Sequence, residues 1–330
     1  MSFPVFNLYQ PQTVDEALGY MAEFSGRYTL MAGGTDVMPD YGQHLNTQPH
    51  VISLSGIRLM TRLSASSIGA CVTLSEVIRN GQMLPPVIVE TARGIAGPAV
   101  RSSATVGGNL LLSGRCRFFN QSVLSRAARG SCMKADGSGC LAVVQEESCY
   151  AISSGDLVPV MLALGASFRL AGPDGERLVP AAEFYLPDGI HANVLEPYEL
   201  LTEIILPDDA SELSAGYMKL GGRSAMDYPE AGVAVAVKRQ TDGSNHGGVA
   251  RCRVALGSLG PNPLVLTIAG GDLDGLSAYD LSERIWKMLS PETHPVRNGN
   301  FRPGYRKTQA KEYLRALLER LLVLPPTSTE

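Results

Sequence analysis

Four of the six cysteines in this chain fall within one short stretch, which runs from Arg115 to Tyr150. They are separated by 15, 7 and 8 residues, and they are Cys116, Cys132, Cys140 and Cys149. Glycine, serine and aspartate residues surround them, and these residue types favour turns over helix or strand. Four thiols on one loop-like segment can converge on a single point. Soft thiolates in that arrangement select zinc or an iron–sulfur cluster.

The spacing of these cysteines leaves three interpretations open. Structural zinc sites usually use tight C-x₂₋₄-C pairs, and no such pair occurs here, which disfavours zinc. Long gaps suit a cluster held by a dedicated loop, although the short bacterial ferredoxin spacing is also absent. The third interpretation is four unrelated thiols, of which two could form a disulfide. Cys71 and Cys252 lie in apolar, strand-like contexts and are expected to be small buried hydrophobes.

Composition and charge exclude several classes of protein. The chain has 330 residues, of which 45% are hydrophobic and 18% charged, and its net charge is −4. These values predict a globular protein of two or three domains, and the lack of a Lys/Arg block argues against nucleic-acid binding. We find no signal-peptide pattern and no apolar run near the roughly 18 residues that span a bilayer. We therefore expect a cytoplasmic protein without a membrane span, in which reduced thiols are the default.

Two paired-glycine turns form a second candidate site. The sequence AGGTD at 32–36 follows a short apolar strand, and the sequence TVGGN occurs at 105–109. Glycines let the backbone approach a ligand closely, and successive N–H groups can bind an anion. Neither stretch matches a dinucleotide fingerprint or a P-loop, so either could be an ordinary tight turn. Together they could face each other across one elongated, phosphate-containing ligand.

The hydrophobic pattern predicts an α+β chain. The first 55 residues contain a strand, a glycine turn, a connecting segment and a second strand, in that order. This order indicates a small parallel unit. A polar stretch at 208–212 indicates a linker, beyond which strands at hairpin spacing precede two helices. Strands are expected at 28–31, 50–54, 68–73, 166–170, 177–179, 200–206, 216–220, 231–239 and 250–256, with turn residues at 172–175, 242–243 and 247–248. Helices are expected at 13–24, 74–80, 87–95, 279–288 and 308–322, with a further short apolar helix capped by Asp156.

Together these segments resemble the FAD-binding medium subunit of the molybdenum hydroxylases, the xanthine dehydrogenase family. The two glycine stretches look like that family's FAD-binding turns, and further motifs follow in the family's order: Gly155-Asp156-Leu157, Glu199-Leu200-Leu201, Tyr217-Met218-Lys219-Leu220 and Arg253-Val254-Ala255-Leu256-Gly257. The resemblance covers nearly the whole chain. It implies a two-part FAD-binding region, with a small parallel βαβ unit at 1–55 and a mixed α/β domain at 56–207. A C-terminal domain of antiparallel strands and helices would follow at 213–330.

The resemblance also implies which residues contact FAD. The first turn would wrap the pyrophosphate and the second would close on the flavin side, with glycine required because a side chain would collide with the cofactor. Lys219 would stabilise negative charge on the reduced flavin ring. No catalytic residue is expected on this chain. The implied contacts are Leu30, Met31, Ala32, Gly33, Gly34, Thr35, Asp36, Val37, Ala104, Thr105, Gly107, Gly108, Asn109, Asp156, Leu200 and Lys219.

The cysteine segment narrows the resemblance. Most medium subunits pass from the second FAD turn almost directly to the Ser-Asp-Leu stretch, which reads Gly-Asp-Leu here, whereas this chain carries an insertion at 114–150. It is similar to the insertion in the beta subunit of 4-hydroxybenzoyl-CoA reductase, which holds a [4Fe–4S] cluster, and this implies that the four cysteines are its ligands. Electrons would then pass between a ferredoxin-like carrier, the cluster, FAD and a [2Fe–2S] small subunit. A molybdopterin large subunit would reduce an aromatic acyl-CoA.

Two other functions stay open. The chain could be the medium subunit of an oxidising molybdenum hydroxylase that passes electrons outward to NAD or another acceptor, because homologous dehydrogenases use NAD on this subunit. It could instead be a zinc-stabilised scaffold subunit in which the glycine turns are purely structural. Flavin and iron–sulfur absorbance would exclude the scaffold, since zinc is colourless.

Overall fold

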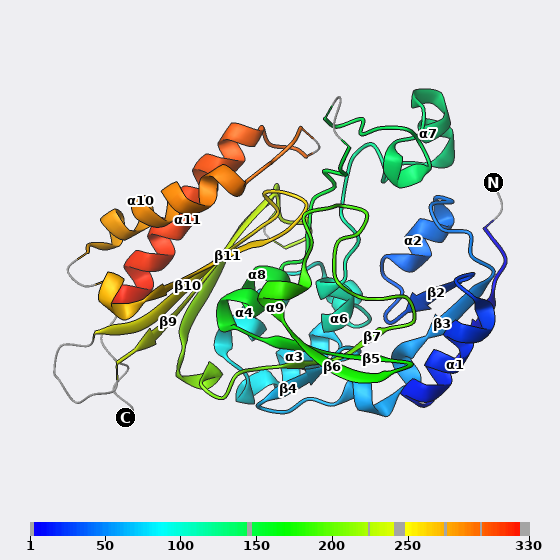
Figure 1. Ribbon diagram of the computed structural model, residues 1–330, viewed down its shortest axis with the longest axis horizontal. Helices are drawn as coiled ribbons and strands as arrows, with labels where there is room; N and C mark the ends of the chain where they lie inside the picture. The colour runs from blue at the N-terminus through cyan, green and yellow to red at the C-terminus, as the bar shows by residue number, and fades with distance from the viewer. Residues whose placement is uncertain are drawn as a thin grey trace.

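The computed structural model describes residues 3–143, 147–223, 225–240, 248–273, 276–297 and 299–323 of the chain. Its strands form three sheets that follow one another along an elongated molecule, with the N-terminal sheet at one end and the C-terminal sheet at the other (Figure 1). The predicted α+β fold is confirmed. The turn predicted at 242–243, and Gly247 of the next one, lie outside the described residues.

The N-terminal sheet has three parallel strands in the order β1-β3-β2. The helix α1 begins after Thr13, whose hydroxyl accepts a hydrogen bond from the Glu16 N–H at 3.2 Å, and α2 follows the AGGTD loop. The predicted parallel unit is therefore correct. The strand β1 was not predicted, because it is three residues long and largely exposed. The elements are β1 (Asn7–Tyr9), α1 (Val14–Phe24), β2 (Tyr28–Met31), α2 (Val37–Gly42) and β3 (His50–Ser53).

The middle part is an antiparallel sheet in the order β4-β7-β5-β6, covered by short helices. Thr73 caps α3 in a full capping box with Glu76. The predicted hairpin at 172–175 joins β5 to β6. The elements are β4 (Ser67–Gly69), α3 (Leu74–Asn80), α4 (Pro86–Arg93), α5 (Pro98–Arg101), α6 (Val106–Leu110), α7 (Val123–Arg129), α8 (Leu157–Leu164), β5 (Ser167–Gly172), β6 (Gly175–Pro180), α9 (Ala181–Phe184) and β7 (Leu200–Ile205).

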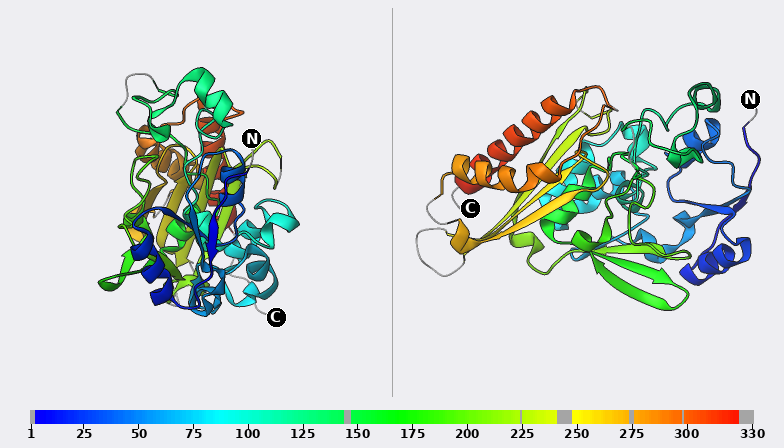
Figure 2. Two further views of the ribbon diagram at one scale, coloured as in Figure 1. Left: turned by 90° about the vertical axis from the view of Figure 1, so that its right-hand side faces the viewer. Right: turned by 45° about the horizontal axis from the view of Figure 1, so that its top comes forward.

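The C-terminal part is an antiparallel sheet in the order β11-β10-β9-β8. Figure 2 shows two long helices lying together on one face of this sheet. The stripe of leucines at 314–321 is buried between helix and sheet, as its helical spacing predicts. The elements are β8 (Ser214–Leu220), β9 (Ala231–Arg239), β10 (Val249–Gly257), β11 (Leu264–Ala269), α10 (Ala278–Leu289) and α11 (Pro303–Val323).

The apolar core is continuous from the N-terminal helix to the C-terminal sheet. Valines on one face of β9 and β10 pack under α10 and α11, whereas the alternating alanines Ala234, Ala236 and Ala255 face the middle part. Small residues on that face let α8, which is buried along its whole length, lie close against the sheet. This packing holds the two ends of the molecule in a fixed relation around the middle part.

Two sequence predictions are wrong in detail. Residues 105–109 were expected to form a tight turn, but Thr105 instead caps the short helix α6. Asp156 was expected to cap α8, yet its side chain makes no capping bond, and the Asn109 side-chain oxygen accepts the Leu157 N–H at 2.9 Å instead. Among the described residues, we find no helix with the length and apolar character that crossing a membrane would require.

Candidate cofactor site

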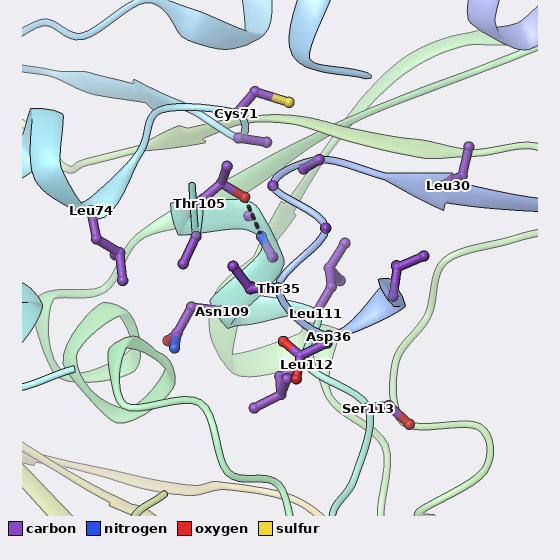
Figure 3. Close-up of a pocket in the computed structure, with 18 of the residues that line it drawn as sticks. Leu30, Thr35, Asp36, Cys71, Leu74, Thr105, Asn109, Leu111, Leu112 and Ser113 are labelled. Carbon is purple, nitrogen blue, oxygen red and sulfur yellow. Dashed lines mark hydrogen bonds between the residues drawn. The ribbon is translucent and has the colours of Figure 1, made fainter. Parts of the chain in front are cut away.

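A cavity of about 480 Å³ lies between the two glycine stretches (Figure 3). It opens beyond the carboxyl end of β2, where the AGGTD loop faces α6. Fourteen of the sixteen residues predicted to contact FAD line it, and Met31 and Lys219 do not. The fourteen are Leu30, Ala32, Gly33, Gly34, Thr35, Asp36, Val37, Ala104, Thr105, Gly107, Gly108, Asn109, Asp156 and Leu200.

The first glycine stretch needs its glycines for reasons internal to the protein. A Cβ on Gly33 would lie 1.8 Å from the carbonyl oxygen of Ser103, so the first loop packs backbone to backbone against the segment before α6. Gly34 has a φ of +71°, in the left-handed region that side chains rarely adopt. The expected reason for glycine, collision with the cofactor, is therefore not needed to explain either position.

The second stretch is anchored in the same way. The Thr105 hydroxyl accepts a hydrogen bond from the Gly108 N–H at 3.0 Å, which is the dashed line in Figure 3. A Cβ on Gly107 would lie 2.7 Å from both the Cβ and the carbonyl oxygen of Ala70. The start of α6 is thus fixed against the turn that follows β4, and the two loops form a preformed wall on each side of the cavity.

A buried ion pair closes the inner end of the cavity. Asp156 is only 3% exposed, and its carboxylate lies 2.9 Å from the Lys219 ammonium and accepts a hydrogen bond from the Tyr217 hydroxyl at 3.2 Å. Burial raises the pKa of Asp156, and the Lys219 charge opposes that shift. Lys219 also donates to the Gly94 carbonyl at 2.8 Å. Lys219 therefore lies behind the cavity wall, in a smaller cavity of about 170 Å³ that it shares with Asp156.

A loop from the C-terminal part, which sequence reasoning missed, forms part of the cavity wall. Met226, Asp227 and Tyr228 line the cavity, although no motif marks them. The Tyr228 hydroxyl donates to Asp36 at 2.9 Å, and the guanidinium of Arg115 lies 4.1 Å from the centre of the Tyr228 ring. Arg115 is also 3.4 Å from Asp36. This cluster ties the first loop, the base of the insertion and the C-terminal part together.

Some of the other lining residues that were missed are sequence neighbours of the predicted motifs. Leu111, Leu112 and Ser113 lie two to four residues after the second stretch, and Glu199 and Leu201 flank Leu200, so their position in the sequence is a signal that could have found them. Cys71, expected to be a buried hydrophobe, is 4% exposed, and burial raises its pKa to about 12. This buried thiol also lines the cavity.

The cysteine segment joins the cavity wall at a neck, which is the point where Arg115 and Ile152 lie side by side. Arg115 and Ile152 pair through two backbone hydrogen bonds of 2.8 and 2.9 Å, so the insertion begins and ends at one point. It projects from the body of the molecule and carries α7 at its tip (Figure 1). Its four cysteines are free thiols.

The four thiols lie in one neighbourhood. Burial raises the pKa of Cys116, and Cys132 and Cys140 are close enough to raise it further. Burial likewise raises the pKa of Cys149, with a contribution from Cys140. Within the described ranges, however, no three His, Cys, Asp or Glu side chains are gathered tightly enough to hold a metal ion. The donor chemistry suits a soft metal centre, but the thiols are not drawn together into a ligand shell.

Comparison with known proteins now identifies the family. Residues 4–209 match the family described as the FAD binding domain in molybdopterin dehydrogenase. The chain belongs to this family. It is 26% identical over 323 residues to the carbon monoxide dehydrogenase medium chain of Afipia carboxidovorans, covering 96% of each protein. It is 28% identical over 288 residues to the aldehyde oxidoreductase FAD-binding subunit PaoB of Escherichia coli K12, covering 83% of this chain and 86% of that protein.

Solved structures support the same fold. One chain of the Cu,Mo-CO dehydrogenase structure in its cyanide-inactivated form superposes with a TM-score of 0.75 at 24% identity, covering 97% of this chain and 99% of that one. A chain of quinoline 2-oxidoreductase from Pseudomonas putida 86 gives a TM-score of 0.72 at 18% identity, covering 97% and 98%. The chain is thus an FAD-binding oxidoreductase subunit of the molybdenum hydroxylase type. These matches do not show the 4-hydroxybenzoyl-CoA reductase branch or a [4Fe–4S] cluster.

Proposed function

We propose that this chain is the electron-transfer subunit of a molybdenum-containing complex and works in the reducing direction. It would connect a ferredoxin-like carrier, a [4Fe–4S] cluster on the four cysteines, FAD and a [2Fe–2S] small subunit. A molybdopterin large subunit would then remove the hydroxyl from an aromatic acyl-CoA such as 4-hydroxybenzoyl-CoA. FAD, when bound, supplies the redox chemistry of this chain. The observation that carries the proposal is the direct connection of the four-cysteine segment to the wall of the FAD cavity.

That connection is short. Ser113 lines the cavity, and Cys116 follows it by three residues. A fully extended chain spans about 3.3–3.6 Å per residue, so the backbones of these two residues lie within about 11 Å of each other. Arg115, between them, also reaches back to Asp36 on the opposite wall of the cavity. A redox centre on these thiols would therefore lie close to a cofactor in the cavity.

The residues of the cavity fit the polar and apolar parts of FAD. The first loop presents backbone N–H groups near Gly34 that can bind phosphate oxygens, while leucines and Ile95 supply apolar surface. The buried Asp156–Lys219 pair fixes one part of the wall, and Tyr228 forms another part. In this proposal these residues bind and orient the cofactor. None of them is assigned a proton-transfer step.

The four cysteines fit the cluster by donor type. Thiolates are the usual ligands of [4Fe–4S] centres, whose potential depends on charge, hydrogen bonds to sulfur and exposure. Cys132 and Cys149 are buried, and Cys116 and Cys140 are partly exposed, so a centre here would lie near the surface, within reach of a carrier protein. We propose all four as ligands, with the segment closing around the iron on assembly.

Anaerobic purification, followed by absorption spectroscopy and quantitation of iron, sulfide, zinc and FAD, tests the proposal. We expect about four irons and one FAD per chain. Cys132→Ser should lose iron and keep FAD, while Cys252→Ala, which removes a thiol from the sheet outside the segment, should keep both. Zinc in place of iron in the wild type, or full iron in Cys132→Ser, would contradict the ligand assignment.

A second candidate is an oxidising complex that passes electrons outward to NAD or another acceptor. It is favoured by the names of the relatives, which include carbon monoxide and xanthine dehydrogenases. Anaerobic mixing distinguishes the two directions. Bleaching of the flavin absorbance of the holo-complex by reduced ferredoxin, but not by NADH, supports the reducing assignment. Bleaching by NADH alone would favour the oxidising one.

A further inference from the structure

The smaller cavity of about 170 Å³ lies between three elements of the fold. Thr91 lines it from α4, Tyr217 and Lys219 line it as alternate residues on one face of β8, and Asp156 directly precedes α8. Asp156 also lines the larger cavity, which is the candidate FAD site. Its carboxylate therefore lies where the two cavities meet.

The Thr91 hydroxyl is a buried polar group that lacks a protein partner. Thr91 is 4% exposed, and its Oγ1 atom has no hydrogen-bond partner among the residues that the structure describes. The ammonium of Lys219 is already used, because it contacts Asp156 and donates to the carbonyls of Gly94 at 2.8 Å and Asp227 at 3.3 Å. A buried hydroxyl without a partner is costly, and ordered water commonly satisfies such groups.

The cavity has the size and polarity that bound water requires. A water molecule takes up about 30 Å³ in the liquid and needs two to four polar partners when it is buried, so this cavity has room for several. Glu90 also lines the cavity and is exposed on α4, whereas Asp156 is 3% exposed. The cavity thus joins a surface position to a buried carboxylate at the cofactor site.

We infer that the smaller cavity holds ordered water that binds the Thr91 hydroxyl, and that this water carries protons between solvent and Asp156 when FAD is reduced in the larger cavity. Reduction of FAD takes electrons from the reductant and protons from solvent. A proton would move from solvent beside Glu90 along the water to Asp156, form an O–H bond on its carboxylate, and pass on to the cofactor, so that Asp156 ends ionised again. Lys219 and Tyr217 both contact Oδ1 of Asp156, and Oδ2 is the oxygen that we assign to the water.

The inference is independent of the cysteine cluster and of the direction of electron flow. It requires only that FAD binds in the larger cavity, since the same path would release protons when the cofactor is oxidised. A chain without iron, or one that passes electrons to NAD, would therefore contradict the proposed function and leave this inference standing.

Thr91→Val tests for the water, because it removes the hydroxyl and keeps the shape of the side chain. If water satisfies the hydroxyl, the variant loses a hydrogen bond, and the folded-to-unfolded equilibrium constant of the apoprotein should fall about fivefold in urea unfolding. Thr308→Val makes the same exchange at an exposed position of α11 and should change the constant less than about twofold. An equal or higher stability of Thr91→Val would mean that the hydroxyl is dry and would overturn the inference.

Proton uptake tests the path to Asp156. The FAD-loaded full chain is mixed in weakly buffered solution with reduced methyl viologen, a one-electron donor that carries no proton, and a pH indicator and the flavin absorbance are followed together. Thr91→Met, which fills the cavity with an apolar side chain, and Asp156→Asn should both slow proton uptake at least about tenfold, while Thr308→Val keeps the wild-type rate. Wild-type uptake in both variants would overturn the path. If either variant fails to fold or to bind FAD, Thr91→Val takes its place, and an unchanged rate of uptake in Thr91→Val overturns the path as well.

Discussion

Replacing Gly33 with alanine is expected to weaken FAD binding, because it would force apart the two loops that form the cavity. An ideal Cβ at this position lies 1.8 Å from the carbonyl oxygen of Ser103 and 3.1 Å from the nitrogen of Ala104. Ordinary contact begins at 3.4 Å, so the loops must separate by more than one ångström. Both contacts are with backbone atoms, and no side chain can rotate to relieve them.

The expected size follows from the cost of overpacking. Inserting an extra carbon into a packed site typically costs about 1–3 kcal/mol. If the apoprotein relieves this strain by separating the loops, FAD must bring them back together, and the same energy appears as a rise in Kd of roughly fivefold to 150-fold. Gly19→Ala is the matched control, since a Cβ on Gly19, within α1, meets nothing within 4 Å. That change should stabilise the protein by about 0.5–1 kcal/mol and leave FAD affinity unchanged.

Two measurements test the prediction for Gly33→Ala. Titration of the apoprotein with FAD, followed by flavin fluorescence, gives the Kd, and urea unfolding of the apoprotein gives the free energy of unfolding. Wild-type values of both for Gly33→Ala would refute the contact with Ser103. A lower free energy of unfolding with an unchanged Kd would show that the loops relax away from the cavity, and the link between this contact and cofactor binding would be wrong.

Two further predictions concern charged pairs. Asp156→Asn should cost about 3–5 kcal/mol in urea unfolding, because it leaves the Lys219 ammonium, 2.9 Å away, without its buried partner; an unchanged free energy of unfolding would refute the pair. Asp209→Asn should cost about 1–3 kcal/mol at neutral pH, because Asp209 accepts hydrogen bonds from Lys238 and Arg251 at 2.8 Å each. The Lys238 hydrogen bond holds the pKa of Asp209 below 3.8, so the unfolded chain binds the proton first on acidification. The wild type should therefore exceed Asp209→Asn in stability above pH 3.8 and lose this advantage as the pH falls through the lower folded-state pKa, whereas a constant difference would contradict the linkage.

The cavity was largely predictable from sequence because its walls are built from two contiguous stretches. Residues 30–37 and 104–109 carry their own turn and cap chemistry, so local pattern and resemblance together named most of the residues that line the cavity in these two stretches. The reason for each glycine was not predictable. Gly33 is constrained by Ser103 and Gly107 by Ala70, and these contacts join segments 70 and 37 residues apart, which no local pattern encodes.

The remaining errors arise where the contacts of a residue are made by residues that are distant from it in the sequence. Asp156 has the residue type and position of a helix cap, but Lys219 lies 2.9 Å from its carboxylate and Asn109 supplies the cap instead. Lys219 was expected to face the flavin, yet the same ion pair directs it behind the cavity wall. Tyr228 had no signal at all, because its role depends on Asp36 and Arg115, which lie more than a hundred residues away in the chain.

The geometry of the neck shows how the cysteine segment joins the cavity wall. Arg115 and Ile152 face each other through two backbone hydrogen bonds, and a Cβ on Gly114 would lie 3.1 Å from the Cβ of Ala151. The chain therefore leaves the cavity wall and returns to it at almost the same place. A segment joined at such a point adds little strain to the elements on either side, because their ends are already adjacent. The insertion contacts the cavity wall at its base, where Arg115 pairs with Asp36 and Lys134 donates a hydrogen bond to Ser113.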